Sequence, residues 1–506
     1  MSLAKFIDEK VNPAIALSNF DQGWSDALNQ SKVFGIWLAI KNLHHKFLKD
    51  NFSKFGNFLC FLSYLLSAVL FLILPAPYFA EDKGWLAMIV AAAFGFRILG
   101  ALLSGKDKYT PSAVDFLVLA FVGMNIIATL GSHYLAASVK GLMKMAVYFC
   151  SYFLFASTIQ QAPRTRGIVL TACLLVAGVV VSLHGLWQYK VGVAPLATWE
   201  DPNVEDKTVR IYSFLRNPNL LAGYLVPLIP VGFGAAIMAF VEGGWKRHLS
   251  ITIFLASALI LVATILTGSR GGYMGIAASL AALGFIILNI LWSSKPKLRP
   301  ALASVVVAIP VGLLGILHMF PKYEHRLLSI FAGWGHSSNA YRLNVYKSSF
   351  QMFLDNWWLG IGPGNSTFKL AYGLYMRTGF DALGTYCVPL EVAVETGIFG
   401  LFIFAWMILA ALTRAHINFW NKFSGSERWL CAGAAAGLMG MMVHGLVDTV
   451  YYRPQVQFIF WLLLAMCAYI RPQVQGTEPG SSPGADEDKT LEAIPAAGTD
   501  EDADQK

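Results

Sequence analysis

Twelve apolar runs of about 20 residues each dominate this sequence and decide what it can fold into. A helix needs about 20 mostly apolar residues to cross ~30 Å of hydrocarbon. Inside a bilayer the backbone must also satisfy its own hydrogen bonds, which a helix does within one segment. The runs therefore predict an all-α fold, a polytopic membrane bundle of about 12 transmembrane helices. They lie near residues 57–75, 84–104, 112–131, 136–157, 167–187, 219–240, 249–268, 271–292, 301–320, 388–411, 429–447 and 456–470.

The composition excludes a soluble or nucleic-acid-binding protein. Hydrophobic residues make up 56% of the chain and charged residues only 13%, whereas a soluble protein is about one quarter charged. The net charge of +8 comes from short basic clusters between apolar runs, and such clusters set membrane orientation. Five of the six cysteines fall inside apolar stretches without CxxC spacing. We therefore expect no disulfide framework, no metal site and no cofactor.

The distribution of lysine and arginine predicts that both termini are cytoplasmic. Cytoplasmic loops of membrane proteins carry an excess of these residues. With the N-terminus inside, five cytoplasmic loops hold twelve basic residues, and the short loops on the other side hold three. The twelve are Lys106, Lys108, Arg164, Arg166, Lys246, Arg247, Lys295, Lys297, Arg299, Arg414, Lys422 and Arg428, and the three are Lys83, Arg270 and Arg453.

Two polar segments flank the membrane domain of residues 57–470. Residues 1–56 are too long and too polar for a cleaved signal peptide. Within them, apolar residues between Val33 and Phe47 recur at helical spacing, which indicates either a helix in the cytoplasmic interface or one packed on the bundle. Residues 471–506 form an acidic tail that we expect to be disordered, because it has too little apolar surface to offset the entropy of ordering.

Only two connections are long, and both face away from the cytoplasm in this topology. Residues 188–218 end in an Arg-Asn-Pro-Asn motif that starts at Arg216, which is either a plain helix start or part of a site. Residues 321–387 contain a predicted helix near 341–354 and the glycine run 360–365. This run lacks the Lys-Ser/Thr of a phosphate loop, so we interpret it as a tight turn. Long loops in compact proteins are commonly functional.

Ionisable residues gather near the external ends of several spans. Charged side chains at membrane depth are costly, so each is a functional hypothesis. The spacing of four places Glu391 with Glu395, and His444 with Asp448, on one helix face each. Counted from the start of its span, Glu395 is expected ~10 Å deep. These groups form either ion pairs between helix ends or, with the arginines, a site for a diphosphate or another oxyanion, because guanidinium binds phosphate oxygens in pairs.

Five short motifs in this order resemble the O-antigen ligase and polymerase superfamily over residues 57–470. They are Arg210, Arg216-Asn-Pro-Asn, Ser269-Arg270-Gly-Gly, Arg342 with Gly360-Ile-Gly-Pro-Gly, and Glu395-Thr-Gly-Ile-Phe-Gly-Leu. The stretch 444–457 resembles one branch, named putative inorganic-carbon (bicarbonate) transporters. The resemblance implies a metal-independent membrane glycosyltransferase of the bacterial inner membrane. Such an enzyme passes a glycan from a polyprenyl diphosphate to a lipid or protein acceptor on the external face, among membrane lipids.

The resemblance also implies roles for single residues. Arg210 and Arg270 take the positions of the arginines that hold the lipid diphosphate. The superfamily's ligases carry a histidine nine residues before the glutamate of their Glu-Thr-Gly motif, where this chain has Tyr386. Tyrosine is a poor base at neutral pH, so the base for the acceptor is expected among Glu391, Glu395 and His444. The supporting substrate-binding residues are Arg216, Arg342, Asp448 and Arg453. An alternative function, a bicarbonate or small-anion transporter or its accessory, uses the same arginines to attract the anion.

Overall fold

The computed structural model describes residues 11–16, 50–76, 83–104, 109–193, 210–301, 303–304, 337–420 and 425–470. In these ranges the chain is helical and contains no strand, which confirms the all-α class. Three predictions concern residues outside these ranges. They are the helix at 33–47, the tail 471–506 and, except for residues 301, 303 and 304, the span 301–320. The helices are α2 (Asn12–Ile15), α5 (Asp50–Ile73), α7 (Lys83–Ser104), α8 (Ala113–Leu130), α9 (Leu135–Gln161), α10 (Pro163–Val191), η2 (Ser213–Leu215), α11 (Pro218–Leu225), α12 (Leu228–Glu242), α13 (Lys246–Leu266), α14 (Arg270–Ser294), η3 (Pro296–Leu298), α17 (Ser337–Asp355), α18 (Asn365–Tyr372), α19 (Val388–Trp420), α20 (Arg428–Gly445), η6 (Val450–Tyr452) and α21 (Pro454–Tyr469).

Nine segments of the described chain are long and apolar enough to cross a membrane. This makes the protein polytopic, although the number twelve is not confirmed. The predicted runs at 429–447 and 456–470 are helices, α20 and α21, but α20 is rich in glycine and alanine and α21 has only 16 residues. The run at 219–240 consists of two helices, α11 and α12, which meet at Val226 and Pro227.

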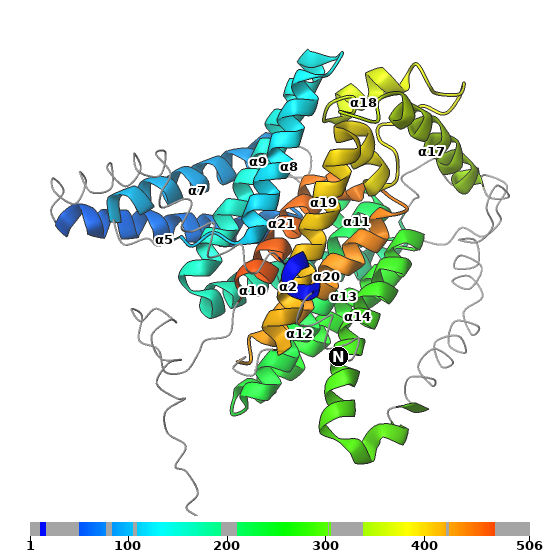
Figure 1. Ribbon diagram of the computed structural model, residues 1–506. Coiled ribbons are helices and arrows are strands. Elements are labelled where there is room, and N and C mark those ends of the chain that lie inside the picture. The colour runs from blue at the N-terminus through cyan, green and yellow to red at the C-terminus, as the bar shows by residue number, and fades with distance from the viewer. Residues whose placement is uncertain are drawn as a thin grey trace, which may run out of the picture.

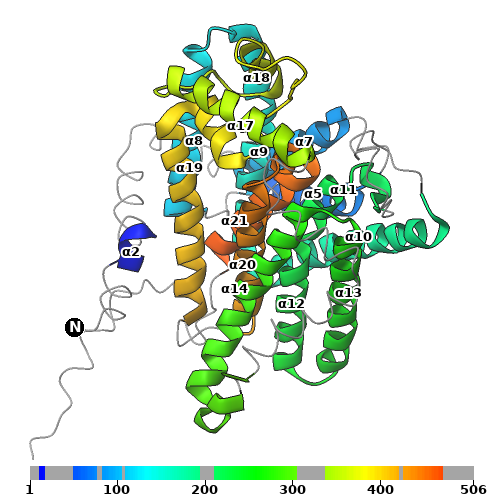
Figure 2. The same cartoon turned by 90° about the vertical axis from the view of Figure 1, so that its right-hand side faces the viewer.

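The helices form a bundle that α17 and α18 cover at one end (Figure 1). The turn between α8 and α9 lies beside this cap, whereas the connections from α12 to α13 and from α14 to η3 lie at the opposite end (Figure 2). Helices α5 and α7 pack on each other and run across the direction of α19 (Figure 1). Helix α17 confirms the predicted helix near 341–354, and it lies over one end of the bundle (Figure 1).

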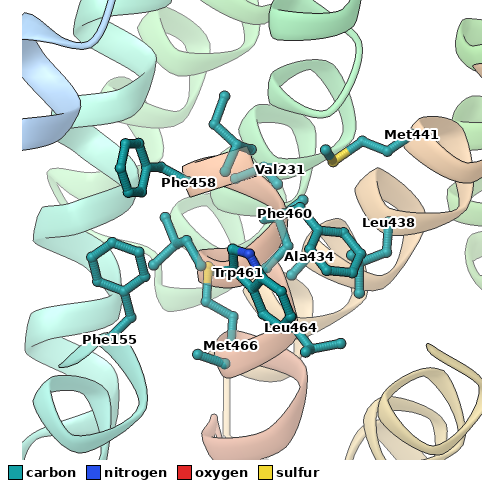
Figure 3. Close-up of a cluster of buried hydrophobic side chains, with 14 of the residues drawn as sticks. Phe155, Val231, Ala434, Leu438, Met441, Phe458, Phe460, Trp461, Leu464 and Met466 are labelled. Atoms are coloured by element: carbon teal, nitrogen blue, oxygen red, sulfur yellow. The ribbon is translucent and has the colours of Figure 1, made fainter. Parts of the chain in front are cut away.

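Helix α21 forms the centre of the bundle. All its residues from Pro454 to Tyr469 are buried, as expected for a helix that is apolar on every side. Trp461 lies among side chains of α9, α12 and α20 (Figure 3). Its indole N–H donates to Gln457 Oε1 at 2.8 Å, so burial leaves this polar group satisfied. Helix α21 thus fixes α9, α19 and α20 around one apolar core.

Small residues allow α20 to approach its neighbours closely. A Cβ on Gly440 would lie 2.8 Å from the carbonyl oxygen of Gly275 in α14, and one on Gly234 of α12 would lie 2.4 Å from that of Trp429. Membrane helices lack a hydrophobic driving force between them and rely on such close backbone packing. The contact between α14 and α20 matters for the site, because it brings the start of α14 beside the end of α20.

Glu242 joins three connections at the end of the bundle opposite α17. It binds Arg164 Nη2 at 2.7 Å and Lys246 Nζ through its two carboxylate oxygens, and Ser426 Oγ donates to Oε1 at 2.6 Å. The count of basic residues predicts that all three connections lie on the cytoplasmic side. The structure shows that they lie together at one end of the bundle. That this end is cytoplasmic stays a prediction.

We expect Glu242→Ala to lower the free energy of unfolding by about 1–2 kcal/mol, because it removes one acceptor shared by three donors. Thermal unfolding of the purified protein in detergent measures this. Lys297→Ala, an exposed position at the same end, is the control and should stay within about 0.5 kcal/mol of the parent. Equal unfolding temperatures for Glu242→Ala and the parent would contradict the proposed joining role.

Candidate functional site

Arg210 lies against the turn that carries Arg270. Its Nε donates to the Thr267 carbonyl oxygen at 3.0 Å, and the neighbouring Ile211 N–H donates to Leu266 O at 3.3 Å. Arg270 is the first residue of α14, and Ser269 caps that helix by accepting from Gly272 N at 3.2 Å. Arg210 therefore contacts the turn from which Arg270, 60 positions later in the sequence, begins α14.

The Arg-Asn-Pro-Asn motif begins helix α11. Asn217 Oδ1 accepts from the N–H groups of Asn219 and Leu220 at 2.8 and 3.1 Å, and Pro218 occupies the first helical position. Arg216 before it is exposed and has a left-handed backbone, with φ 56°. The motif is thus a helix start, as one of the two interpretations predicted. The cap uses Asn217 and leaves the Asn219 side chain for other contacts.

Asn219 links Arg210 to Asp448. Arg210 Nη2 donates to Asn219 Oδ1 at 3.0 Å, and Asn219 Nδ2 donates to Asp448 Oδ2 at 3.0 Å. Arg342 of α17 reaches the same oxygen with Nη2 at 3.1 Å. Four segments of the chain thus meet in one hydrogen-bonded row, Arg210, Asn219, Asp448 and Arg342, which we call the Asp448 network. Asp448 is nearly buried within it, where screening by water is weak.

Tyr386 borders this network from the loop before α19. The guanidinium carbon of Arg342 lies 5.9 Å from the centre of its ring, and its carbonyl oxygen accepts from the Tyr346 hydroxyl at 3.1 Å. Burial raises the pKa of Tyr386 well above its usual value and that of Tyr346 to about 12. Both phenols are protonated at neutral pH, so they are suited to donate hydrogen bonds and unsuited to act as bases.

Glu391 and Glu395 hold two turns of the segment between α17 and α19. Glu391 Oε2 accepts from Thr385 N at 2.8 Å and from its hydroxyl at 3.2 Å, and Glu395 Oε1 accepts from Gly364 N at 2.7 Å. Both glutamates are buried. Both carboxylates are therefore engaged with backbone N–H groups of the loop.

The glycine run 360–365 packs into a break in α19. Gly397 has φ 68°, which interrupts the helix. The freed carbonyl oxygens of Val394 and Glu395 accept from the N–H groups of Ile361 and Gly362 at 2.9 and 3.0 Å. Three glycines of the run have positive φ, as the interpretation of a tight turn predicted. The run is therefore a structural insert beneath the cap.

His444 lies four residues before Asp448 but is closed off. Only 1% of its surface is exposed, and neither ring nitrogen has a hydrogen-bond partner among the described residues. A Cβ on Gly271 would lie 2.6 Å from its ring, so the imidazole packs directly against the residue after Arg270. Arg453, at the start of α21, is exposed.

Sequence reasoning named every charged member of the network but missed Asn219 as a bridge. The only signal was its place in the Arg-Asn-Pro-Asn motif, where the cap explained it. Within the described ranges, no three His, Cys, Asp or Glu side chains lie close enough to hold a metal ion. The arrangement offers fixed guanidinium groups for an anion and one carboxylate among them.

Comparisons with known proteins confirm the resemblance to the O-antigen ligase superfamily. Residues 255–405 match the protein family described as O-antigen ligase. This range carries Arg270, Arg342, Tyr386 and both glutamates. The curated "Teichuronic acid biosynthesis protein TuaE" of Bacillus subtilis (strain 168) is 25% identical over 353 residues, which are 67% of this chain. The aligned region spans 66% of that relative, slightly less than two thirds of its length. The finer resemblance to the bicarbonate-transporter branch stays a prediction.

Proposed function

We propose that this membrane protein, which is similar to O-antigen ligases over residues 255–405, transfers a glycan from a polyprenyl diphosphate to an acceptor. The acceptor is a lipid or a protein, and the reaction takes place on the external face of the bacterial inner membrane. The observation that carries this proposal is that Arg210 contacts the turn before Arg270 and is linked through Asn219 to Asp448, which also binds Arg342. The relative named for teichuronic acid biosynthesis supports a polymer of the cell envelope as the product.

In this proposal the arginines act on the leaving group. When the bond between the anomeric carbon and the diphosphate oxygen breaks, its electron pair moves to that oxygen and negative charge develops there. Guanidinium groups held in place before the reaction stabilise such charge without reorganising. Arg210 is held by Thr267 O and Asn219, and Arg342 by Asp448, so the set is preorganised.

Asp448 is the best-placed carboxylate for the acceptor. The acceptor hydroxyl oxygen forms the new bond to the anomeric carbon, and its proton needs a base. Each of the three carboxylates has one oxygen engaged. Asp448 Oδ2 binds Asn219 and Arg342, so this carboxylate lies among the arginines, whereas Glu391 and Glu395 bind the backbone of the loop at Thr385 and Gly364. We assign Asp448 to bind the hydroxyl and take its proton, and the two glutamates to hold the surrounding loops.

Transfer in vitro tests the proposal. Purified protein is incubated with a radiolabelled polyprenyl-diphosphate glycan and with lipid and protein acceptors extracted from the source cells. We expect Arg270→Ala to lower the transfer rate about 100-fold, because it removes one fixed cation from the leaving group. Arg299→Ala, at the opposite end of the bundle, should transfer at the parent rate. If Arg270→Ala transfers as well as the parent, the proposed diphosphate role fails.

A further inference from the structure

The second half of α17 and the turn after it expose an apolar row. Trp357 and Trp358 are 50% and 54% exposed, and Phe350 and Leu354 are exposed at a spacing of four. A parallel row of polar residues, Lys347, Gln351 and Asp355, is exposed at the same spacing. Residues four apart are neighbours on a helix surface, so two narrow rows, one apolar and one polar, lie side by side. Exposed tryptophan and other apolar side chains beside a lysine are the residue types found at membrane interfaces.

The apolar row continues into the exposed surface of a spanning helix. The Trp358 ring lies 4.8 Å from the Phe399 ring, and Ile398 N donates to Trp357 O at 2.9 Å. Most of α19 before the break at Gly397 is buried, and its exposed apolar residues begin at Ile398 and Phe399 and continue at Phe402. The lipid-facing surface of α19 therefore begins at the level of Trp358.

The length of α19 below this level matches one bilayer. From Ile398 to Trp420 the helix rises about 33 Å at 1.5 Å per residue, close to the ~30 Å of hydrocarbon in a membrane. Trp420 is exposed at the other end. Tryptophan is enriched at both interfaces of membrane proteins, so the tryptophans at the two ends of this stretch mark the two boundaries of the hydrocarbon.

We propose that Phe350, Leu354, Trp357 and Trp358, which we call the tryptophan face, rest on the lipids of the leaflet at the α17 end of the bundle. The partner is the bilayer itself, at the boundary between acyl chains and headgroups. The neighbouring polar row then meets the headgroups, where Lys347 is suited to lipid phosphate. Glu395 precedes Ile398 and therefore lies on the headgroup side of this boundary, whereas its place in the apolar run predicts a depth of ~10 Å.

Fluorescent labels on the two rows test this placement in the full-length protein. Leu354→Cys and its matched control Gln351→Cys are labelled with bimane and reconstituted into phosphatidylcholine vesicles, and the labelled parent gives the background from its six cysteines. Lipids brominated near the headgroup end of the chain should quench the Leu354 label roughly twofold or more relative to the Gln351 label. Aqueous iodide should quench the Gln351 label more strongly.

Three results would overturn the proposal. In the first, iodide quenches both labels equally. In the second, neither iodide nor brominated lipid quenches the Leu354 label. In the third, bromine near the end of the acyl chain quenches the Leu354 label more strongly than bromine near the headgroup. If a cysteine variant fails to fold, tryptophan fluorescence replaces the labels. The emission of the double variant Trp357→Phe/Trp358→Phe is subtracted from that of the parent, and the difference is measured in the same brominated lipids. Quenching of that difference by shallow bromines is expected, and its absence also overturns the proposal. Neither measurement uses glycan transfer, so failure here is distinct from failure of the proposed function.

Discussion

Asp448→Asn is expected to lower the rate of glycan transfer by about 100- to 10,000-fold, the usual contribution of a general base. The asparagine keeps an oxygen that can accept from Asn219 and Arg342, so the hydrogen-bonded row can persist. What it loses is the negative charge that takes the acceptor proton and balances the guanidinium of Arg342, which approaches Asp448 at 3.1 Å. Single-turnover transfer, with the protein in excess over the labelled donor and with saturating acceptor, measures this chemical step directly.

The matched controls are Glu391→Gln and Glu395→Gln. A glutamine oxygen can still accept from Thr385 N or Gly364 N, the bonds that the two glutamates make now. If the glutamates only hold these turns, both variants should keep transfer within about tenfold of the parent, well short of the loss of a general base. A large loss in Glu395→Gln with near-parent transfer in Asp448→Asn would move the base to Glu395 and contradict our assignment.

Binding separates the two halves of the site. Asp448→Asn should still bind a polyprenyl diphosphate, because removing a carboxylate leaves the cations in place, whereas Arg270→Ala should bind it more weakly. Equilibrium binding of the labelled lipid to the purified variants shows this difference. Equal weakening in both variants would mean that Asp448 acts by positioning the arginines and does not receive the proton.

The spans could be predicted from the sequence because hydropathy over about 20 residues has a direct physical cause. The count of twelve is not confirmed: nine described segments follow that rule, the run at 301–320 lies almost entirely outside the described residues, and two described helices depart from the rule. Helix α20 contains many glycines and alanines that serve packing against α12 and α14, and α21 needs only 16 residues because the bundle surrounds it completely.

The polar site was only partly predictable, for a different reason. The spacing of four residues places Glu391 and Glu395 on one helix face, but it does not predict which groups donate hydrogen bonds to their carboxylates. Their partners, Thr385 and Gly364, belong to the long connection before α19, and the sequence does not predict the path of that connection. Asp448 and Arg342 are 106 positions apart, and the amide of Asn219 that completes their network has no distinguishing pattern around it.

Gly397→Ala is expected to destabilise the protein by about 3 kcal/mol or more, the largest effect on stability that we predict. Gly397 has φ 68°, and an added Cβ would lie 2.2 Å from the Trp358 carbonyl oxygen. Both the backbone conformation and a rigid neighbour oppose the methyl group. Chemical denaturation in detergent measures the loss. The control is Gly284→Ala in α14, where a Cβ meets nothing within 4 Å; alanine there should leave stability unchanged or raise it by up to about 1 kcal/mol.

The position of Gly397 makes its effect reach the site. The break releases the carbonyl oxygens of Val394 and Glu395 to the glycine run, and the same run supplies the Gly364 N–H that holds the Glu395 carboxylate. A methyl group at Gly397 therefore separates the cap from α19, and limited proteolysis should cut near Trp358 faster in Gly397→Ala than in Gly284→Ala. Parent-like stability and cleavage in Gly397→Ala would mean that the break tolerates a helical backbone, and that the glycine run holds the cap through other contacts.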